Sequence, residues 1–194
     1  ILLSPVLAGE QTLDEIVLNP WDWYSENGIT LHAGKKVIEV DRVRRIVRAE
    51  DGTAADYDRL LLCTGSNPFI LPVPGKDLPG VLAYRDIADT QAMIDASQKY
   101  RRAVVIGGGL LGLEAANGLM RRGMEVSVVH VMPSLMERQL DAVAGSLLQK
   151  SLEERGVEFL SGVQTSARVG GGAGGRVSAL RSADGSALAT DLVV

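Results

Sequence analysis

Just past the middle of the 194-residue chain lies a glycine-rich motif, Gly107-Gly108-Gly109-Leu110-Leu111-Gly112. In a motif of this spacing the first glycine allows a tight turn, the third lets the backbone approach a diphosphate, and the last lets a helix pack on a strand. The helix N-terminus then offers free N–H groups to the anion. The motif therefore predicts a dinucleotide site formed by Gly107, Gly109, Leu110, Leu111 and Gly112. The alternative is a glycine turn that serves packing alone.

A second position expected to contact a dinucleotide lies about 20 residues further on, where an acid usually accepts a hydrogen bond from the ribose 2′-hydroxyl. His130 occupies this position. An imidazole can donate to or accept from a hydroxyl, and when protonated it can face a phosphate. His130 is therefore a candidate cofactor-binding residue that does not distinguish NADH from NADPH. The alternative is that it simply ends a strand.

The elements around these residues alternate between strands and helices. Short apolar runs predict strands at residues 102–106 and 125–131, and small and apolar residues between them predict a helix over 110–122. Apolar residues at helical spacing predict a further helix over 140–152, followed by a strand within 156–162. Such alternation is typical of an α/β fold with a parallel sheet.

Two parts of the chain repeat one pattern. Residues 28–34 match residues 156–162. Residues 41–65 match residues 175–194, and both of these longer segments contain an Asp-Gly hairpin turn. The predicted fold is therefore α/β with two Rossmann-like domains, each combining a parallel sheet with a three-stranded β-meander.

The repeat also predicts how the chain is divided. Residues 1–84 would form an incomplete domain whose N-terminal βαβ unit is missing, and residues 85–194 a dinucleotide-binding domain that stops early. We expect the chain to be truncated at both ends, because the first copy lacks its own glycine motif and the second ends where the first continues.

Composition excludes several classes of function. A net charge of −4 with 23% charged residues gives no basic surface for nucleic acid, and no apolar run approaches the roughly 18 residues of a membrane span. The single cysteine, Cys63, rules out an internal disulfide framework, is expected to be a small buried strand residue, and fits a cytoplasmic location.

"LLLCTGSNP" at residues 60–68 and "GGGLLGLEAA" at residues 107–116 resemble motifs of the two-dinucleotide-domain FAD/NAD(P)H oxidoreductases. Within that family, "ILLSPVLAGE" and "HVMPSLMERQLD" resemble the large subunits of NAD(P)H-dependent nitrite reductases. The resemblance implies FAD on the first domain and NAD(P)H on the second. Electrons would pass to iron–sulfur and sirohaem centres in regions outside this chain, where nitrite is reduced to ammonia.

The resemblance also implies roles for individual residues. Those expected to contact FAD are Val37, Thr64, Gly65, Leu3 and Ser4. Glu114 matches an acid near the nicotinamide; the alternative is an ordinary exposed helix glutamate. Pro5 stands where thiol-using relatives carry a redox cysteine, so thiol–disulfide chemistry is not expected. No catalytic residue and no metal ligand is assigned.

These implications predict a cofactor-binding fragment of a flavin-dependent reductase, inactive on nitrite by itself and holding FAD weakly or not at all. Its expected partners are dinucleotides, downstream redox domains or a small subunit, and a second copy in a homodimer. Two alternatives stay open, a stand-alone NAD(P)H–ferredoxin or rubredoxin reductase and a dinucleotide-binding sensor without turnover.

Overall fold

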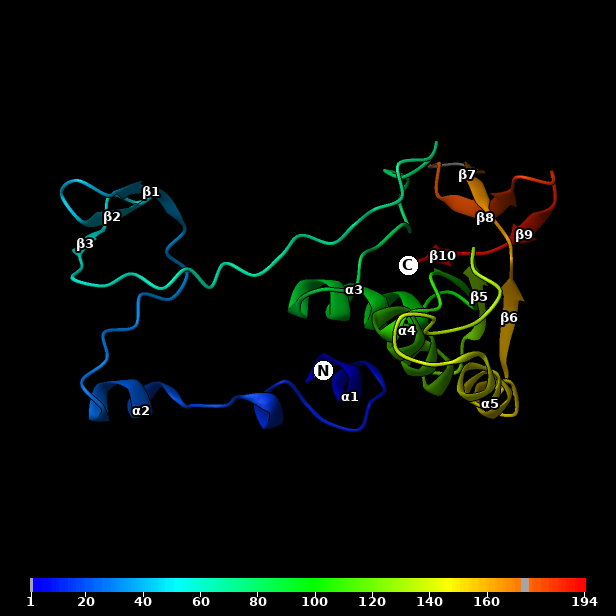
Figure 1. Ribbon diagram of the computed structural model, residues 1–194, viewed down its shortest axis with the longest axis horizontal. Helices are drawn as coiled ribbons and strands as arrows, with labels where there is room; N and C mark the ends of the chain where they lie inside the picture. Colours follow the sequence, from blue (N-terminus) through cyan, green and yellow to red (C-terminus); the bar gives the residue numbers. More distant parts are fainter. Residues whose placement is uncertain (1, 172–174) are drawn as a thin grey trace. The chain divides into compact units, whose positions relative to one another are not determined.

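The protein is described by a computed structural model that covers residues 2–171 and 175–194. The chain forms two compact units (Figure 1). The larger unit combines the N-terminal segment ending at Ile16 with Asn67–Val194, and the smaller unit is Val17–Ser66. These units differ from the predicted domain ranges, 1–84 and 85–194, which remain predictions about the complete fold.

A four-stranded parallel sheet lies at the centre of the larger unit. Its strand order is β10-β4-β5-β6, formed by β4 (Arg102–Ile106), β5 (Glu125–His130), β6 (Val157–Ser161) and β10 (Leu192–Val193). The central strand β4 carries three consecutive apolar side chains that are almost wholly buried. A strand covered on both faces requires such a continuous apolar run. The predicted parallel sheet of this part of the chain is therefore confirmed.

The described residues of the larger unit form five helical segments, and the last two of them match the helices predicted from the sequence. The five segments are α1 (Leu3–Leu7), η1 (Asp14–Ile16), α3 (Ile87–Ser97), α4 (Leu110–Arg121) and α5 (Ala142–Glu153). The helix predicted over 110–122 is α4, which ends where Gly123 adopts a φ of 86°. The helix predicted over 140–152 is α5, whose N-cap Asp141 accepts a hydrogen bond from the Ala144 N–H at 2.8 Å.

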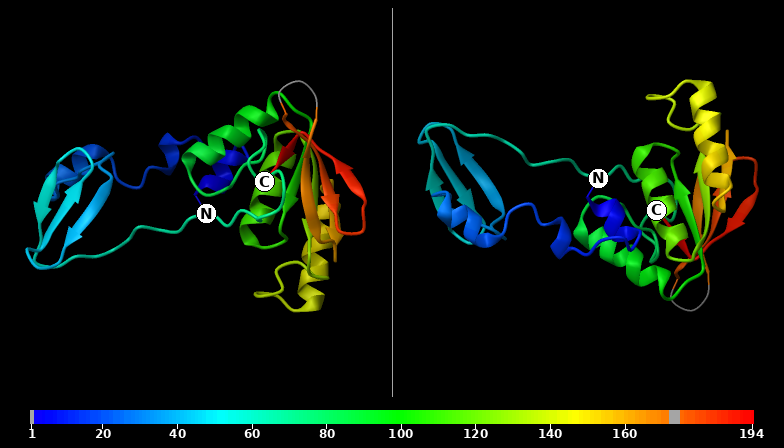
Figure 2. Two further views of the ribbon diagram at one scale, coloured as in Figure 1. Left: turned by 90° about the horizontal axis from the view of Figure 1, so that it is seen from above. Right: turned by 90° about the horizontal axis from the view of Figure 1, so that it is seen from below.

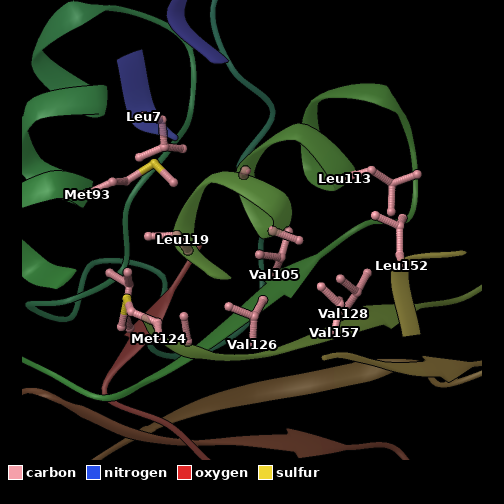
Figure 3. Packing of buried hydrophobic residues seen from close by; sticks show 14 of the residues in the cluster. Leu7, Met93, Val105, Leu113, Leu119, Met124, Val126, Val128, Leu152 and Val157 are labelled. Carbon is pink, nitrogen blue, oxygen red and sulfur yellow. The ribbon is translucent and has the colours of Figure 1, made fainter. Parts of the chain in front are cut away.

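The two faces of the parallel sheet have different covers. Figures 1 and 2 show helices α1, α3 and α4 on one side and a β-meander on the other. Alternate residues of β4 pack on opposite faces of the sheet. Val105 belongs to the hydrophobic cluster under the helices, and Val104 belongs to the cluster against the meander. Figure 3 shows the helical cluster, in which Leu119 of α4 and Val126 of β5 are buried.

The meander is the antiparallel sheet β7-β8-β9, with β7 (Thr165–Gly170), β8 (Val177–Ser182) and β9 (Ala187–Ala189). The predicted Asp-Gly turn joins β8 to β9, and its Gly185 has a φ of 88°. The smaller unit contains the other meander, with α2 (Trp21–Glu26), β1 (Val37–Asp41), β2 (Ile46–Ala49) and β3 (Ala54–Asp56). Both predicted meanders are therefore formed.

The parallel sheet predicted for residues 1–84 is not present in the described part of the chain. Residues 28–34 and 60–65 belong to no strand there, although their counterparts form β6 and β10. A parallel strand needs a neighbour, and β6 and β10 have β5 and β4 to pair with. Without that pairing Cys63 is exposed, so its prediction as a buried strand residue was wrong.

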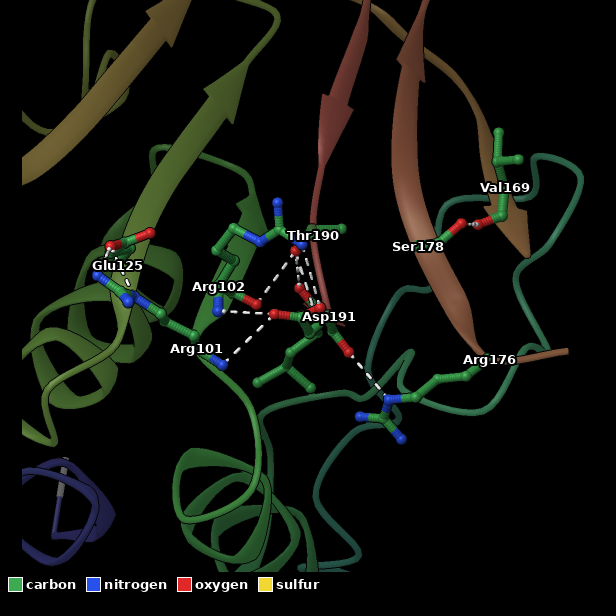
Figure 4. A network of polar contacts seen from close by, with 9 residues as sticks. Arg101, Arg102, Glu125, Val169, Arg176, Ser178, Thr190 and Asp191 are labelled. Atoms are coloured by element: carbon green, nitrogen blue, oxygen red, sulfur yellow. Dashed lines mark hydrogen bonds and ion pairs between the residues drawn. The ribbon is translucent and has the colours of Figure 1, made fainter. Parts of the chain in front are cut away.

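The edge strand β10 is fastened to β4 through Asp191, as Figure 4 shows. One oxygen of the Asp191 carboxylate accepts hydrogen bonds from the backbone N–H groups of Arg101 and Arg102, at 3.4 and 3.0 Å. The other lies 3.4 Å from the Arg102 guanidinium. Burial raises the pKa of the Asp191 carboxyl, but hydrogen bonds from the Arg102 backbone and side chain outweigh it and leave the pKa below its usual value.

Replacing Asp191 with asparagine is expected to lower the free energy of unfolding at neutral pH by about 1–2 kcal/mol, because charge-assisted hydrogen bonds are lost. A lowered pKa in the folded state stabilises the protein above the usual aspartate pKa of about 3.9, and this contribution is lost as the pH falls through the folded value. Urea unfolding of both proteins at pH values on either side of about 3.9 measures the effect. A wild-type advantage that is the same at both pH values contradicts this account.

Candidate dinucleotide-binding site

The glycine motif forms the turn between β4 and α4. Gly107 follows the last residue of β4 and has a φ of 122°, a conformation that side chains rarely allow. Its N–H donates to the Val129 carbonyl of the neighbouring strand at 2.9 Å, which fixes the turn at the carboxyl edge of the sheet. The tight-turn requirement predicted at Gly107 is therefore met.

Two further glycines of the motif are required by packing. A Cβ at Gly112 would lie far closer to the Gly107 carbonyl oxygen than van der Waals contact allows. A Cβ at Gly108 would lie 2.5 Å from Leu135 Cδ2 and 2.9 Å from His130 Cδ2. At these two positions the alternative explanation, a turn shaped by packing, is sufficient.

Gly109 is different from the other glycines of the motif. Its φ of −87° and ψ of −177° are open to any residue. Among the described residues outside its immediate neighbours, no atom lies within 4 Å of a Cβ built on it. Neither backbone strain nor packing requires a glycine here, and the open space lies at the N-cap of α4. A side chain at this position would meet open space at the helix N-terminus.

The N-terminus of α4 presents hydrogen-bond donors that could bind an anion. The first N–H groups of a helix have no partner within the helix, and here they belong to the first turn that begins at Leu110. Leu110 and Leu111 have exposed fractions of 51% and 44%. The motif residues predicted from the sequence are thus brought together at the N-terminus of α4. This end of a helix carries a partial positive charge.

His130 ends β5 beside the glycine motif, as predicted, but its imidazole is buried. The residue is 8% exposed, and its Nε2 lies 3.1 Å from Oε2 of Glu137. A hydrogen bond from its own backbone N–H, followed by one from His130, lowers the pKa of the Glu137 carboxyl below its usual value. Sequence analysis missed Glu137; the signal available was an acid in the loop directly after the strand.

Glu114 of α4 lies in a hydrogen-bonded cluster with two hydroxyl groups. Ser4 donates through Oγ to Glu114 Oε2 at 2.5 Å, and the Tyr84 hydroxyl donates to Ser4 Oγ at 3.2 Å. Burial raises the pKa of Tyr84, which keeps its phenol protonated. Glu114 is thus a partly buried, hydrogen-bonded carboxylate rather than the exposed helix residue of the alternative interpretation. Tyr84 is a second residue that sequence analysis missed.

Packing of α1 on α4 brings Ser4 to Glu114. The Leu7 side chain lies against Gly118 of α4, where a Cβ would be 2.6 Å from Leu7 Cγ. The Arg122 guanidinium donates to the carbonyls of Leu7 and, at 2.8 Å, of Val6. Leu3 is the first residue of α1 and is half-buried.

The remaining candidates lie in the smaller unit, which is described separately. Val37 begins β1 and is 53% exposed. Thr64 and Gly65 lie in a stretch that is neither helix nor strand, where Gly65 has a φ of 71°. The roles of these residues toward FAD remain predictions.

Residues 2–171 and 175–194 contain no group of three or more His, Cys, Asp or Glu side chains arranged to hold a metal ion. Nor does any helix in the described ranges have the length and apolar character needed to cross a membrane.

A sequence model of the pyridine nucleotide-disulphide oxidoreductases matches residues 1–194. The nitrite reductase [NAD(P)H] of Bacillus subtilis (strain 168) is 54% identical over the whole chain, which covers 24% of that relative. The nitrite reductase [NAD(P)H] large subunit of Klebsiella oxytoca is 39% identical over 99% of the chain and 20% of the relative. The chain therefore spans about a quarter or less of the length of these relatives.

Solved structures give a similar result. A ferredoxin reductase from Rhodopseudomonas palustris matches with a TM-score of 0.90 and 28% identity, over 99% of this chain and 47% of that one. Putidaredoxin reductase in its covalent complex with putidaredoxin matches with a TM-score of 0.89 and 31% identity, over the same shares of the two chains.

Proposed function

The chain belongs to the pyridine nucleotide-disulphide oxidoreductase family, and we propose that it is the cofactor-binding part of a flavin-dependent NAD(P)H reductase of nitrite. In the complete protein, NAD(P)H and FAD would supply hydride transfer, and electrons would continue to iron–sulfur and sirohaem centres outside this chain. The 54% identity to a nitrite reductase supports this choice of final acceptor. Downstream redox domains or a small subunit would be the partners, and a homodimer remains a prediction.

The observation that carries the proposal is the open position at Gly109. A glycine that neither the backbone nor packing requires, set at the N-terminus of a twelve-residue helix, leaves room for a ligand that approaches the backbone closely. The donors in front of it favour an anion, and the βαβ unit around it is the usual setting for a dinucleotide pyrophosphate.

The residues of the chain bind and orient, while the cofactors supply the redox chemistry: a nicotinamide gives up a hydride and a flavin accepts it. Leu110, Leu111 and Gly112 would present backbone N–H groups to the pyrophosphate. Glu114 would lie near the nicotinamide end, where its carboxylate could accept a hydrogen bond. The Ser4 hydroxyl holds one oxygen of that carboxylate at 2.5 Å, which leaves the other for the ligand.

A stand-alone reductase that delivers electrons to a ferredoxin is the second candidate. It is favoured by the 31% identity and the TM-score of 0.89 to putidaredoxin reductase. The two candidates share the dinucleotide site and differ in the electron acceptor.

Calorimetric titration of the 194-residue chain with NADH is expected to give a single binding site. The complete protein, loaded with FAD and mixed with NADH without oxygen, is expected to lose its oxidised-flavin absorbance and to reduce nitrite on further turnover. Flavin reduction with transfer to added ferredoxin but not to nitrite would support the second candidate. Binding without flavin reduction would identify a sensor, and absence of NADH binding would contradict both reductase proposals.

A further inference from the structure

We propose that Glu137, held in place by His130, reads the ribose 2′ position and makes the site selective for NADH over NADPH. The inference rests on the proposed function, because it concerns the coenzyme of the same site. It assigns to a loop residue the task that is usually performed by an acid at the end of the strand.

His130 cannot perform that task as an open side chain, because it is packed into the site. Its ring lies against the glycine motif, where Cδ2 and Cγ would be 2.9 and 3.0 Å from a Cβ at Gly108. Its Nε2 lies 3.1 Å from Glu137 Oε2. The imidazole is therefore a bridge between the glycine turn and Glu137. The carboxylate, whose side chain is 30% exposed, is the member of the pair that reaches solvent.

The loop that carries Glu137 is fixed to the glycine motif from two sides. Leu135 is fully buried, and the N–H of Met136 donates to the Gly108 carbonyl at 3.0 Å. Met136 has a φ of 54°, a conformation that costs free energy for a residue with a side chain. Such a residue persists where its surroundings hold it, so the position of Glu137 directly after it is determined by the fold.

The chemistry of the carboxylate distinguishes the two coenzymes. Glu137 Oε2 lies beside the imidazole, and the carboxylate, which also accepts from its own backbone N–H, has further lone pairs that could accept a hydrogen bond from a ribose hydroxyl. The lowered pKa of Glu137 keeps it ionised at neutral pH, so it repels a 2′-phosphate. Arg138, the next residue, is the cation that would attract that phosphate. We assign the selection to Glu137, because His130 holds its carboxylate next to the glycine motif.

The test is calorimetric titration of the full chain with NAD+ and with NADP+. Wild type is expected to bind NAD+ at least about tenfold more tightly, and Glu137→Gln to lower the NAD+/NADP+ affinity ratio roughly 10- to 100-fold. Glu154→Gln is the matched control, since it removes the same charge at an exposed position after α5, and it should leave the ratio unchanged.

His130 acts as a positioning residue and has its own test. His130→Phe is expected to lower the ratio in wild type but not in the Glu137→Gln background. His130→Gln, which keeps a donor, should restore much of the ratio. A purely structural role of His130 would weaken both coenzymes equally and leave the ratio unchanged.

An unchanged ratio in Glu137→Gln overturns the inference while the proposed function stands, because both coenzymes still bind. A wild-type preference for NADP+ that Arg138→Ala abolishes also overturns it. If wild type binds neither coenzyme, the proposed function itself is contradicted.

Discussion

Replacing Gly109 with aspartate is expected to weaken dinucleotide binding at least about 100-fold without lowering the thermal midpoint. The space at Gly109 is free of neighbouring described atoms within 4 Å, and its backbone angles suit any residue, so the fold accepts the side chain. Aspartate is a favourable N-cap and interacts well with a helix N-terminus, which offsets any loss. Its carboxylate would occupy the space proposed for the pyrophosphate and would repel that anion. Losing several charge-assisted hydrogen bonds, each worth about 1.5–3 kcal/mol, gives the expected loss in affinity.

Titration with NADH and a thermal melt of the same samples measure the two effects. Gly109→Ser is the control, because serine is an equally good N-cap without the charge, and it should lose less affinity than the aspartate variant. Unchanged affinity in the aspartate variant would remove the ligand role from Gly109. A large fall in midpoint would mean that the position serves packing after all.

The Gly112→Ala variant is expected to be less stable, whereas the Gly109 variant is expected to lose ligand affinity without losing stability. The methyl added at Gly112 would collide with the Gly107 carbonyl oxygen, a backbone atom fixed by the β4–α4 turn. Overpacking of this kind costs about 1–3 kcal/mol, and each kcal/mol lowers the midpoint of a chain of this size by about 2–4 °C. Because the turn must shift, NADH binding is expected to fall as well.

Thermal melts of Gly112→Ala beside Gly123→Ala provide the comparison. Gly123, unlike Gly112, has a positive φ, and no described atom lies within 4 Å of a Cβ there, so its substitution reports backbone strain alone. The Gly112 variant should retain less NADH affinity than the Gly123 variant at matched loss of stability. A Gly112 variant with wild-type stability would contradict the described packing of α4 on the turn.

The β4–α4–β5 unit could be predicted from the sequence because its signals are local. Apolar runs, a glycine motif and a terminating glycine lie within about thirty residues of each other and agree with one another. The Asp-Gly turns of both meanders were recognisable for the same reason. The glycine requirements at Gly107 and Gly112 also followed from the motif, since they arise from contacts within the turn.

Other features depend on partners that are distant in sequence. Residues 28–34 have the pattern of a strand, but in the described part of the chain no strand pairs with them, so pattern alone predicted wrongly. Tyr84 and Ser4 are 80 residues apart in the sequence, and Ser4 and Glu114 are 110 residues apart. No local sequence pattern indicates either contact. Glu137 was missed because the usual motif places the ribose acid at His130 itself.

We propose that the turn from Gly107 to Gly112 holds the pyrophosphate of NAD(P)H. Titration of the isotopically labelled chain with NAD+, followed through backbone amide resonances by NMR, tests this most directly. The largest shifts are expected at the amides of Leu110, Leu111 and Gly112. Saturable shifts concentrated elsewhere in the chain, with these three amides unmoved, would contradict it.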